Sequence, residues 1–222
     1  MDTSKLFITR KRKKWKFAHF EQWSNCFAAN AATPATWPEY FSSTQPLVVE
    51  VGAGTADLSV GLAQQRPNDH FVAVDIKSDR LYTGAKFALE HELPHLAFVR
   101  SPIAGITDLF AAQSVKELWI TFPDPFPRKK TAKHRLTHPA FLQRYATVLT
   151  KDGVLRFKTD NRELFLWSLE QFVHQGWQLT ELSFDLHKSD LADEYKVTTA
   201  YERRFMAEEI PINFLTALPP KV

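Results

Sequence analysis

The sequence has little of what several classes of protein require. Its single cysteine, Cys26, among 222 residues excludes a disulfide within the chain, a CxxC zinc site and an iron–sulfur cluster. A chain so poor in thiols also favours a reducing, cytoplasmic setting. No apolar run approaches the roughly 18 residues of a membrane span, and no apolar segment follows the charged N-terminus as a secretory signal would need. We therefore expect a cytoplasmic protein with no metal and no membrane partner.

The overall composition is that of an ordinary globular chain. Hydrophobic residues make up 44% and charged residues 24% of the sequence, which excludes disordered and fibrous classes. No internal repeat or low-complexity tract is visible. The length predicts one domain, or one domain with a short extension, able to bury about 70% of the surface that its unfolded chain exposes.

The net charge of +3 hides an uneven distribution. Residues 1–17 hold seven Lys and Arg against one acid, and residues 128–135 hold five with no acid. The remainder has 16 basic and 24 acidic residues, a balance of −8. Clustered cations suit a polyanion, because each neutralised phosphate releases counterions, although an N-terminal run of this kind also occurs as a solvated tail or a targeting signal. The second cluster consists of Arg128, Lys129, Lys130, Lys133 and Arg135.

Strand and helix patterns alternate from Pro46 onward. Residues 28–44 resemble a loose connection, and the two final strand-like runs, 177–184 and 198–206, fit a hairpin-like ending. Strict alternation predicts a parallel sheet covered on both faces. We expect a basic arm and linker over residues 1–45 and, over 46–222, a doubly wound α/β domain of Rossmann-like type with a mostly parallel sheet and an antiparallel C-terminal strand. The other strands are expected at 47–51, 71–75, 96–100, 117–121 and 153–159, and the helices at 56–65, 79–92, 105–112, 139–149 and 162–174.

The first strand ends in a glycine turn that can bind a ligand. Gly52 and Gly54 permit a tight turn and a close approach of the backbone. The dinucleotide fingerprint GxGxxG fails at Asp57, whose charge, with that of Glu50, disfavours a pyrophosphate at this turn. S-adenosylmethionine, which has a sulfonium and no phosphate, suits the turn better. Asp75 ends the second strand, where a carboxylate can accept hydrogen bonds from ribose hydroxyls.

A proline-rich segment follows the fourth strand, with the sequence Thr121-Phe-Pro-Asp-Pro-Phe-Pro-Arg-Lys-Lys130. Its prolines fix Asp124 in a rigid turn. Phe122 and Phe126 flank that carboxylate and could stack on a nucleobase or pack in the core. The basic residues that follow could bind phosphates while Asp124 meets the edge of a base.

At these residues the chain resembles bacterial single-chain tRNA (guanine-N7)-methyltransferases. The resemblance covers roughly residues 45–206 and rests on ExGxG at the first turn, FPDPFPRKKTAKHRL after the fourth strand, Thr159-Asp160, and Thr199-Ala-Tyr-Glu202. It implies a class I S-adenosylmethionine-dependent methyltransferase. The expected product is N7-methylguanosine in tRNA, in the variable-loop region, formed by in-line attack of the unprotonated N7.

The resemblance also implies roles for individual residues. It implies Asp124 at the active centre, in contact with substrate. Arg128 stands where the family has a substrate-binding lysine, and Ser101 stands near the family's usual acidic adenine contact. The implied cofactor contacts are Glu50, Gly52, Gly54, Asp75 and Ser101, and the further implied substrate contacts are Arg128, Asp160, Thr199, Tyr201 and Glu202.

Two alternatives remain at this point. One is a non-catalytic RNA-binding protein on the same fold, favoured by the missing acid near Pro102 and distinguished by a cofactor-binding titration. The other is an NAD-linked oxidoreductase, disfavoured by Asp57 and by the basic segment. The expected partner is tRNA, and the expected oligomeric state is a monomer or a homodimer.

Overall fold

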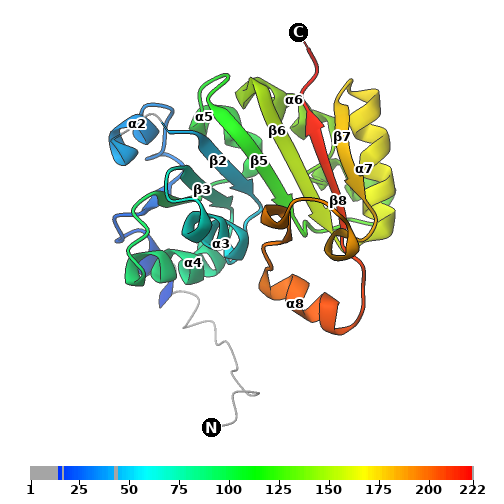
Figure 1. Cartoon of the computed structure of the whole chain (residues 1–222). Coiled ribbons are helices and arrows are strands. Elements are labelled where there is room, and N and C mark those ends of the chain that lie inside the picture. The colour runs from blue at the N-terminus through cyan, green and yellow to red at the C-terminus, as the bar shows by residue number, and fades with distance from the viewer. Residues whose placement is uncertain (1–14, 17, 43–44, 222) are drawn as a thin grey trace.

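The fold is a mixed eight-stranded sheet between two layers of helices (Figure 1). The computed structural model describes residues 15–16, 18–42 and 45–221. The strand order is β1-β4-β3-β2-β5-β6-β8-β7, in which β8 runs antiparallel to both of its neighbours and the other pairs are parallel. This confirms the expected α/β class. The strands are β1 (Cys26–Ala28), β2 (Leu47–Val51), β3 (His70–Asp75), β4 (Leu96–Arg100), β5 (Val115–Thr121), β6 (Leu149–Thr159), β7 (Gln178–Ser183) and β8 (Asn213–Leu218).

Alternate residues of the buried strands build two cores, one on each face of the sheet. On β2, Leu47, Val49 and Val51 join the core under α2, α5, α6 and α7, while Val48 joins the core under α3 and α4. Because both faces are covered, β2 is apolar throughout except at Glu50, as expected of a central parallel strand. The helices are α2 (Thr36–Phe41), α3 (Asp57–Gln65), α4 (Ser78–Glu90), α5 (Ile106–Leu109), α6 (Pro139–Val148), α7 (Arg162–His174) and α8 (Ala200–Ala207).

The last expected strand, over residues 198–206, is wrong. This stretch forms α8, and the antiparallel strand of the ending is β8, farther along the chain. A capping box starts the helix: Thr199 Oγ1 accepts from the Glu202 amide (3.1 Å), and the Glu202 carboxylate accepts from the Thr199 amide (2.9 Å). These reciprocal bonds satisfy amides that the first helical turn leaves free, and they outweigh the strand-like alternation.

Part of the segment expected as a loose connection, residues 28–44, is ordered against the domain. The preceding strand β1 pairs with β4, with Cys26 opposite Phe98. Trp37 of α2 is buried, and its indole N–H donates to the Leu109 carbonyl (2.7 Å). Most of the basic arm, residues 1–14 and 17, lies outside the described residues.

The chain reverses its direction of winding at β2. From β2 the sheet grows through β3 and β4 on one side and through β5 and β6 on the other. The loops after β2 and β5 therefore diverge at the carboxyl edge of the sheet, which is where doubly wound folds bind ligands. None of the described helices is long and apolar enough to cross a membrane.

The spacing His91-Glu92-Leu93-Pro94-His95 matches HExxH, the zinc-binding pattern of some peptidases. That pattern works only within a helix, and α4 ends at Glu90. His91 Nδ1 instead contacts the Phe87 carbonyl (2.9 Å), and His95 Nε2 contacts the Ala63 carbonyl (2.9 Å). No group of potential metal ligands is found within the described residues.

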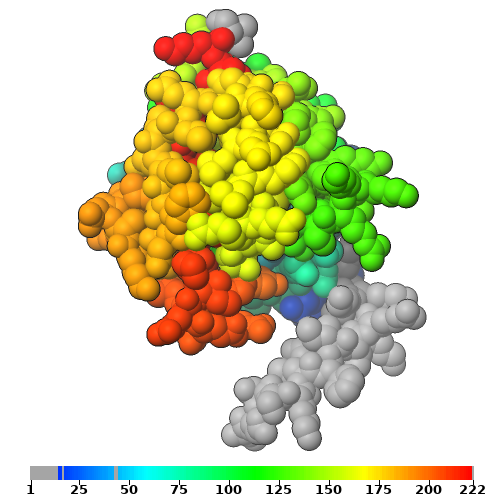
Figure 2. Space-filling view, turned by 90° about the vertical axis from the view of Figure 1, so that its right-hand side faces the viewer, coloured from blue at the N-terminus to red at the C-terminus, as the bar shows by residue number. Residues whose placement is uncertain are grey.

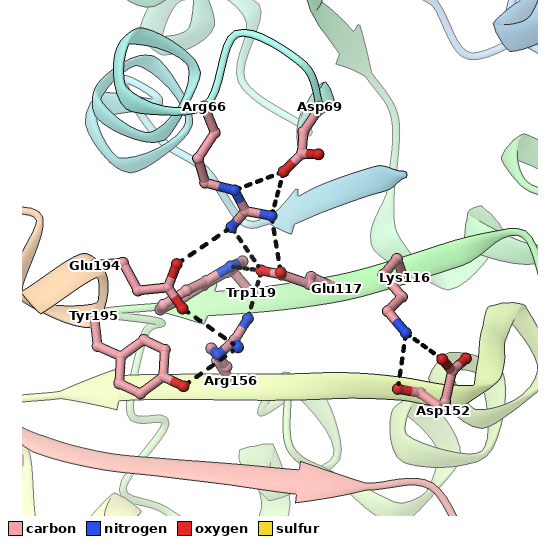
Figure 3. A network of polar contacts seen from close by, with 9 residues as sticks. All are labelled: Arg66, Asp69, Lys116, Glu117, Trp119, Asp152, Arg156, Glu194 and Tyr195. Carbon is pink, nitrogen blue, oxygen red and sulfur yellow. Dashed lines mark hydrogen bonds and ion pairs between the residues drawn. The ribbon is translucent and has the colours of Figure 1, made fainter. Parts of the chain in front are cut away.

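A polar network on β5 and β6 holds the segment between β7 and β8 (Figure 3). Glu117 of β5 accepts two hydrogen bonds from Arg66 (2.9 and 3.1 Å) and pairs with Arg156 of β6. Arg156 also contacts the Tyr195 hydroxyl (3.4 Å) and lies 3.9 Å from the Glu194 carboxylate. Glu194 and Tyr195 belong to a short 3-10 helix, Asp193–Lys196, just before α8. The network therefore ties the approach to α8 to the centre of the sheet.

Lys158 continues this attachment two residues along β6. Its side chain is fully buried, and its ammonium donates to the Val197 carbonyl and to the Glu202 carboxylate, each at 3.0 Å. Burial lowers the pKa of Lys158, and the charge of Glu202 opposes that shift. Glu202 is fully buried as well and also contacts His187 Nε2 (3.3 Å). The pair fixes the first turn of α8 against the sheet.

We predict that Lys158→Met lowers the free energy of unfolding by about 3–5 kcal/mol, because it leaves the buried Glu202 carboxylate without its cation. The matched control is Lys116→Met, which breaks a solvent-exposed pair with Asp152 and should cost less than about 1 kcal/mol. Equilibrium urea unfolding measures both. Lys158→Met/Glu202→Leu should regain much of the loss, and equal effects of the two single changes would contradict this account.

Candidate functional site

The glycine turn after β2 is shaped by the backbone and held to β3. Gly52 and Gly54 have φ values of 70° and 56°, and the Gly52 amide donates to the Val74 carbonyl (2.8 Å). A Cβ at Gly52 would lie 2.8 Å from Leu136 Cδ1, because the segment after the basic cluster approaches the turn closely. Both glycines therefore occupy positions where a side chain would strain the turn.

Asp75 closes the turn from the end of β3. One carboxylate oxygen accepts from the Gly54 amide (2.8 Å), and the other accepts from the Lys77 amide (2.8 Å). An ionised carboxylate offers about four acceptor positions, so each oxygen can still accept a further hydrogen bond. Asp75 lines the cleft described below.

Glu50 lies beneath the turn and is almost wholly buried. Its carboxylate accepts from the Ser59 hydroxyl (2.6 Å) and amide (3.1 Å) and from the Thr121 hydroxyl (2.6 Å). Burial raises its pKa to about 7, against the lowering effect of these hydrogen bonds. Glu50 thus joins β2, α3 and β5 at the base of the cleft and brings a titratable carboxyl to its wall.

The cleft at the carboxyl edge of the sheet has two compartments that share Gly52, Arg80 and the start of the Pro-Asp-Pro loop. Asp124 lies in the wall common to both. The first compartment is lined by Glu50, Asp57, Asp124 and Asp160, with Arg80 as its cation, together with Thr199, Tyr201 and Phe205. The second is more apolar and is lined by Asp75, Ile76, Pro102, Ile103, Phe126, Leu136 and Phe141, among others.

Asp57 links the glycine turn to α8. One of its carboxylate oxygens accepts from the Thr55 hydroxyl (2.8 Å), and the other accepts from the Ala200 amide (2.7 Å). The carboxylate therefore lies at the N-termini of both α3 and α8, where a negative charge is favourable. This contact brings Thr199 and Tyr201 to the first compartment, beside Asp160 at the end of β6.

The residues expected in the site differ in how far they are exposed to the cleft. Tyr201 is 55% exposed, whereas Glu202 is fully buried, with its oxygens occupied by Lys158, His187 and the Thr199 amide. Ser101 is also buried, and it is the following Pro102, Ile103 and Ala104 that line the cleft. Arg128 is exposed on the basic segment and lies outside the lining of both compartments.

Sequence reasoning did not identify Arg80 or Phe205 as site residues. Arg80 stands in the first turn of α4, which begins at Ser78, directly after Lys77 at the carboxyl edge of the sheet. The sequence does indicate this position, because a helix that follows the strand ending at Asp75 must begin at the carboxyl edge of the sheet. Phe205 is missed because residues 198–206 are expected as a strand, whereas its place in the cleft depends on α8 being a helix. Its ring lies 5.9 Å from Phe122 and 6.5 Å from Tyr201.

Comparisons with known proteins agree on the class of the chain. Residues 44–215 match a family model described as "Putative methyltransferase". A tRNA (guanine-N(7)-)-methyltransferase of Lachnoclostridium phytofermentans is 40% identical over 185 residues, which cover 83% of this chain and 86% of that protein. The protein of the same name from Cytophaga hutchinsonii is 35% identical over 212 residues, or 92% of this chain and 96% of that one.

Solved structures show the same fold. The 16S rRNA methyltransferase KamB has a TM-score of 0.64 at 17% identity, covering 85% of this chain and 95% of its own. A 16S rRNA (adenine(1408)-N(1))-methyltransferase from Catenulisporales acidiphilia, solved with its cosubstrate S-adenosylmethionine, has a TM-score of 0.58 at 16% identity. That match covers 85% of this chain and 92% of the other.

Glu50 should make stability depend on pH in a definite direction. Its pKa rises from 4.5 when unfolded to about 7 when folded, so the folded state holds its proton more tightly. The resulting stability is complete below about pH 4.5 and is lost as pH rises through about 7. Relative to wild type, Glu50→Gln should therefore gain on the order of 2–3 kcal/mol between pH 4.5 and pH 8.

Urea unfolding at several pH values measures this difference. The control is Glu170→Gln, an exposed position on α7, which reports any general effect of removing a carboxylate. A difference between Glu50→Gln and wild type that does not change with pH would show that Glu50 keeps its ordinary titration.

Proposed function

Because the chain belongs to the tRNA (guanine-N(7)-)-methyltransferase family, we propose that the two compartments hold S-adenosylmethionine and a guanine base side by side, with Asp124 between them. The enzyme transfers a methyl group from S-adenosylmethionine to N7 of a guanine in tRNA. The observation that carries the proposed arrangement is the position of Asp124 in the wall common to both compartments. We place the reaction in the cytoplasm.

The residues present fit the cofactor. Asp75 retains acceptor positions for ribose hydroxyls, and the apolar side chains of the second compartment, including Ile76 and Ile103, suit an adenine ring. Gly52 lines both compartments, so the glycine turn would hold the methionine end where they meet. The carboxylates of the first compartment favour a positively charged centre there. When bound, the cofactor supplies an electrophilic methyl group on a sulfonium.

Methyl transfer to guanine N7 depends on the alignment of the reacting atoms rather than on proton transfer. Guanine N7 has a lone pair and no proton, so its attack on the methyl carbon needs no general base. The protein must hold N7 about 3–3.5 Å from that carbon and in line with the carbon–sulfur bond. Asp124 and Asp160 would accept hydrogen bonds from the guanine N1 and N2 donors. Their charges would also offset the positive charge that develops on the ring, and adenine would be rejected because its edge differs.

The three residues of the Thr-Ala-Tyr-Glu stretch would have different tasks. Tyr201 is exposed at the rim and would stack on the base, and Thr199 lines the first compartment. Glu202 is buried and fully hydrogen-bonded, which supports a role in holding α8 rather than in touching RNA. This assignment refines the substrate-binding role that the resemblance implies for Glu202.

The target guanine should lie outside a regular helix. N7 is on the major-groove edge, which A-form RNA buries in a deep and narrow groove. We infer a target in the variable-loop region that swings into the first compartment, at a cost of a few kcal/mol. The cations of the basic segment and of the N-terminal arm would offset that cost by binding phosphates. In Figure 2 the red-orange α8 and the green segment containing residues 128–135 lie on the same face of the molecule, on either side of a small teal surface.

Asp124→Ala and Asp160→Ala should each lower kcat/KM for tRNA methylation about a hundredfold or more, because each removes a charge that faces the base. Circular dichroism should show a retained fold. The control is Asp152→Ala, an exposed acid paired with Lys116 far from the cleft, which should methylate at the wild-type rate. Folded Asp124→Ala with wild-type kcat/KM would refute the role given to this carboxylate.

Binding of tRNA should depend steeply on salt, with each phosphate contact contributing about 0.7–0.9 to the slope of log K against log salt concentration. Deleting residues 1–14 removes six of the arm's seven cations and spares Trp15, whose ring packs 5.7 Å from that of Tyr82. The truncated protein should show a shallower slope in filter-binding titrations. An affinity that does not change with salt would exclude the electrostatic account.

A further inference from the structure

The fifth cation of the basic segment, Arg135, differs from the other four. Arg128, Lys129, Lys130 and Lys133 are exposed, whereas Arg135 is only 6% exposed. From the sequence alone the five count equally as phosphate ligands. Burial removes Arg135 from that role, because a phosphate could reach its guanidinium only by displacing the contacts that the group already makes.

Those contacts join the Pro-Asp-Pro loop to α7. The Arg135 Nε donates to the Pro125 carbonyl (2.9 Å), and an Nη donates to the Phe126 carbonyl (3.1 Å). The guanidinium carbon lies 4.4 Å from the ring centroid of Trp167 on α7. The planar group thus bridges two consecutive carbonyls on one side and stacks on an aromatic ring on the other, which a lysine ammonium cannot do.

The loop needs an external clamp for two physical reasons. Phe122 and Phe126 have φ values of 46° and 41°, in a region that costs a bulky residue about 1–3 kcal/mol. Pro123, Pro125 and Pro127 have no amide proton, so the loop has few donors with which to bond its own carbonyls. On the N-terminal side the Phe122 amide donates to the Lys158 carbonyl (2.9 Å). On the C-terminal side the donors come from Arg135.

The clamp also connects the loop to the exposed cations. Lys129–His134 form a short 3-10 helix, and the Arg135 amide donates to the Ala132 carbonyl (3.0 Å) at its end. The His138 amide then donates to the Arg135 carbonyl (2.9 Å), just before α6 begins at Pro139. The exposed cations therefore lie within a closed stretch of chain whose two ends, the loop and residue 135, are fastened together.

We propose that Arg135 is a positioning residue, which fixes the Pro-Asp-Pro loop so that Asp124 stays in the wall between the two compartments. It does not bind phosphate. This inference rests on the proposed function only for the contact between Asp124 and guanine. The clamp itself is a property of the loop and can be measured without activity.

Arg135→Lys tests the proposal, since it keeps the charge and removes the two-carbonyl bridge. It should lower kcat about tenfold to a hundredfold, as a small misplacement of a catalytic group does. The dissociation constant for S-adenosylmethionine and the salt dependence of tRNA binding should stay at wild-type values. Hydrogen exchange of the Phe122 amide should become at least about tenfold faster.

Two other variants separate this role from the alternatives. Arg144→Lys makes the same change at a partly exposed arginine outside the cleft, which donates to the Ala140 carbonyl (2.7 Å) and lies 5.9 Å from the Phe141 ring, and it should behave as wild type. Lys130→Ala removes an exposed cation and should reduce the salt slope by about 0.7–0.9. If Arg135→Lys does not fold, Trp167→Leu removes the stacking ring alone and should show the same pattern with a smaller loss of kcat.

The possible results of these experiments either overturn or support the clamp. Wild-type kcat and wild-type exchange of the Phe122 amide in Arg135→Lys would overturn the clamp, as would a fall in salt slope equal to that of Lys130→Ala. Wild-type protein that yields no N7-methylguanosine would count against the proposed function, and the exchange measurement would still decide the clamp. Fast exchange with a reduced kcat and an unchanged salt slope would support it.

Discussion

An ammonium group in a protein core must be neutralised, and the shape of the cleft follows from how the chain neutralises Lys158. The acceptors come from the segment between β7 and β8, through the Val197 carbonyl and the Glu202 carboxylate. Two residues earlier on β6, Arg156 contacts Tyr195 of the same segment. Because these anchors lie on one face of a central strand, they set α8 at the carboxyl edge of the sheet. Together with the contact between Asp57 and the Ala200 amide, they place Thr199 and Tyr201 beside Asp160.

A further contact of α8 joins it to the glycine turn on the opposite side of the cleft. Asp57, in the first turn of α3, accepts from the Ala200 amide at the start of α8. The glycine turn and the Thr-Ala-Tyr-Glu stretch are thus in direct contact, although more than 140 residues separate them. The Pro-Asp-Pro loop closes the arrangement from the other side, with its strained backbone held between the Lys158 carbonyl and the Arg135 guanidinium. Reaction by alignment requires this kind of rigidity.

The sequence predicted the sheet and the ligand-binding edge because these depend on local patterns. Strands 47–51 and 96–100 and helix 162–174 have the expected bounds, since apolar runs and caps determine them. Residues 198–206 were misassigned as a strand, although Thr199 and Glu202 carry the capping-box spacing that indicates a helix. The burial of Arg135 and Lys158 could not be predicted from the sequence. A charged residue looks the same in a sequence whether it lies in the core or on the surface, and only its partners in the fold distinguish the two. The partners of Lys158 are 39 and 44 residues away along the chain.

We propose an enzyme whose acidic cleft aligns a cationic methyl donor with guanine N7, while separate cations bind the RNA. The most direct measurement incubates the full-length protein with methyl-labelled S-adenosylmethionine and unmodified bulk tRNA, then digests the RNA and separates its nucleosides. The account predicts that the label appears in N7-methylguanosine, in amounts that grow with time and enzyme concentration. Label in a different nucleoside, or unlabelled tRNA in the presence of folded protein that binds the cofactor, would contradict it.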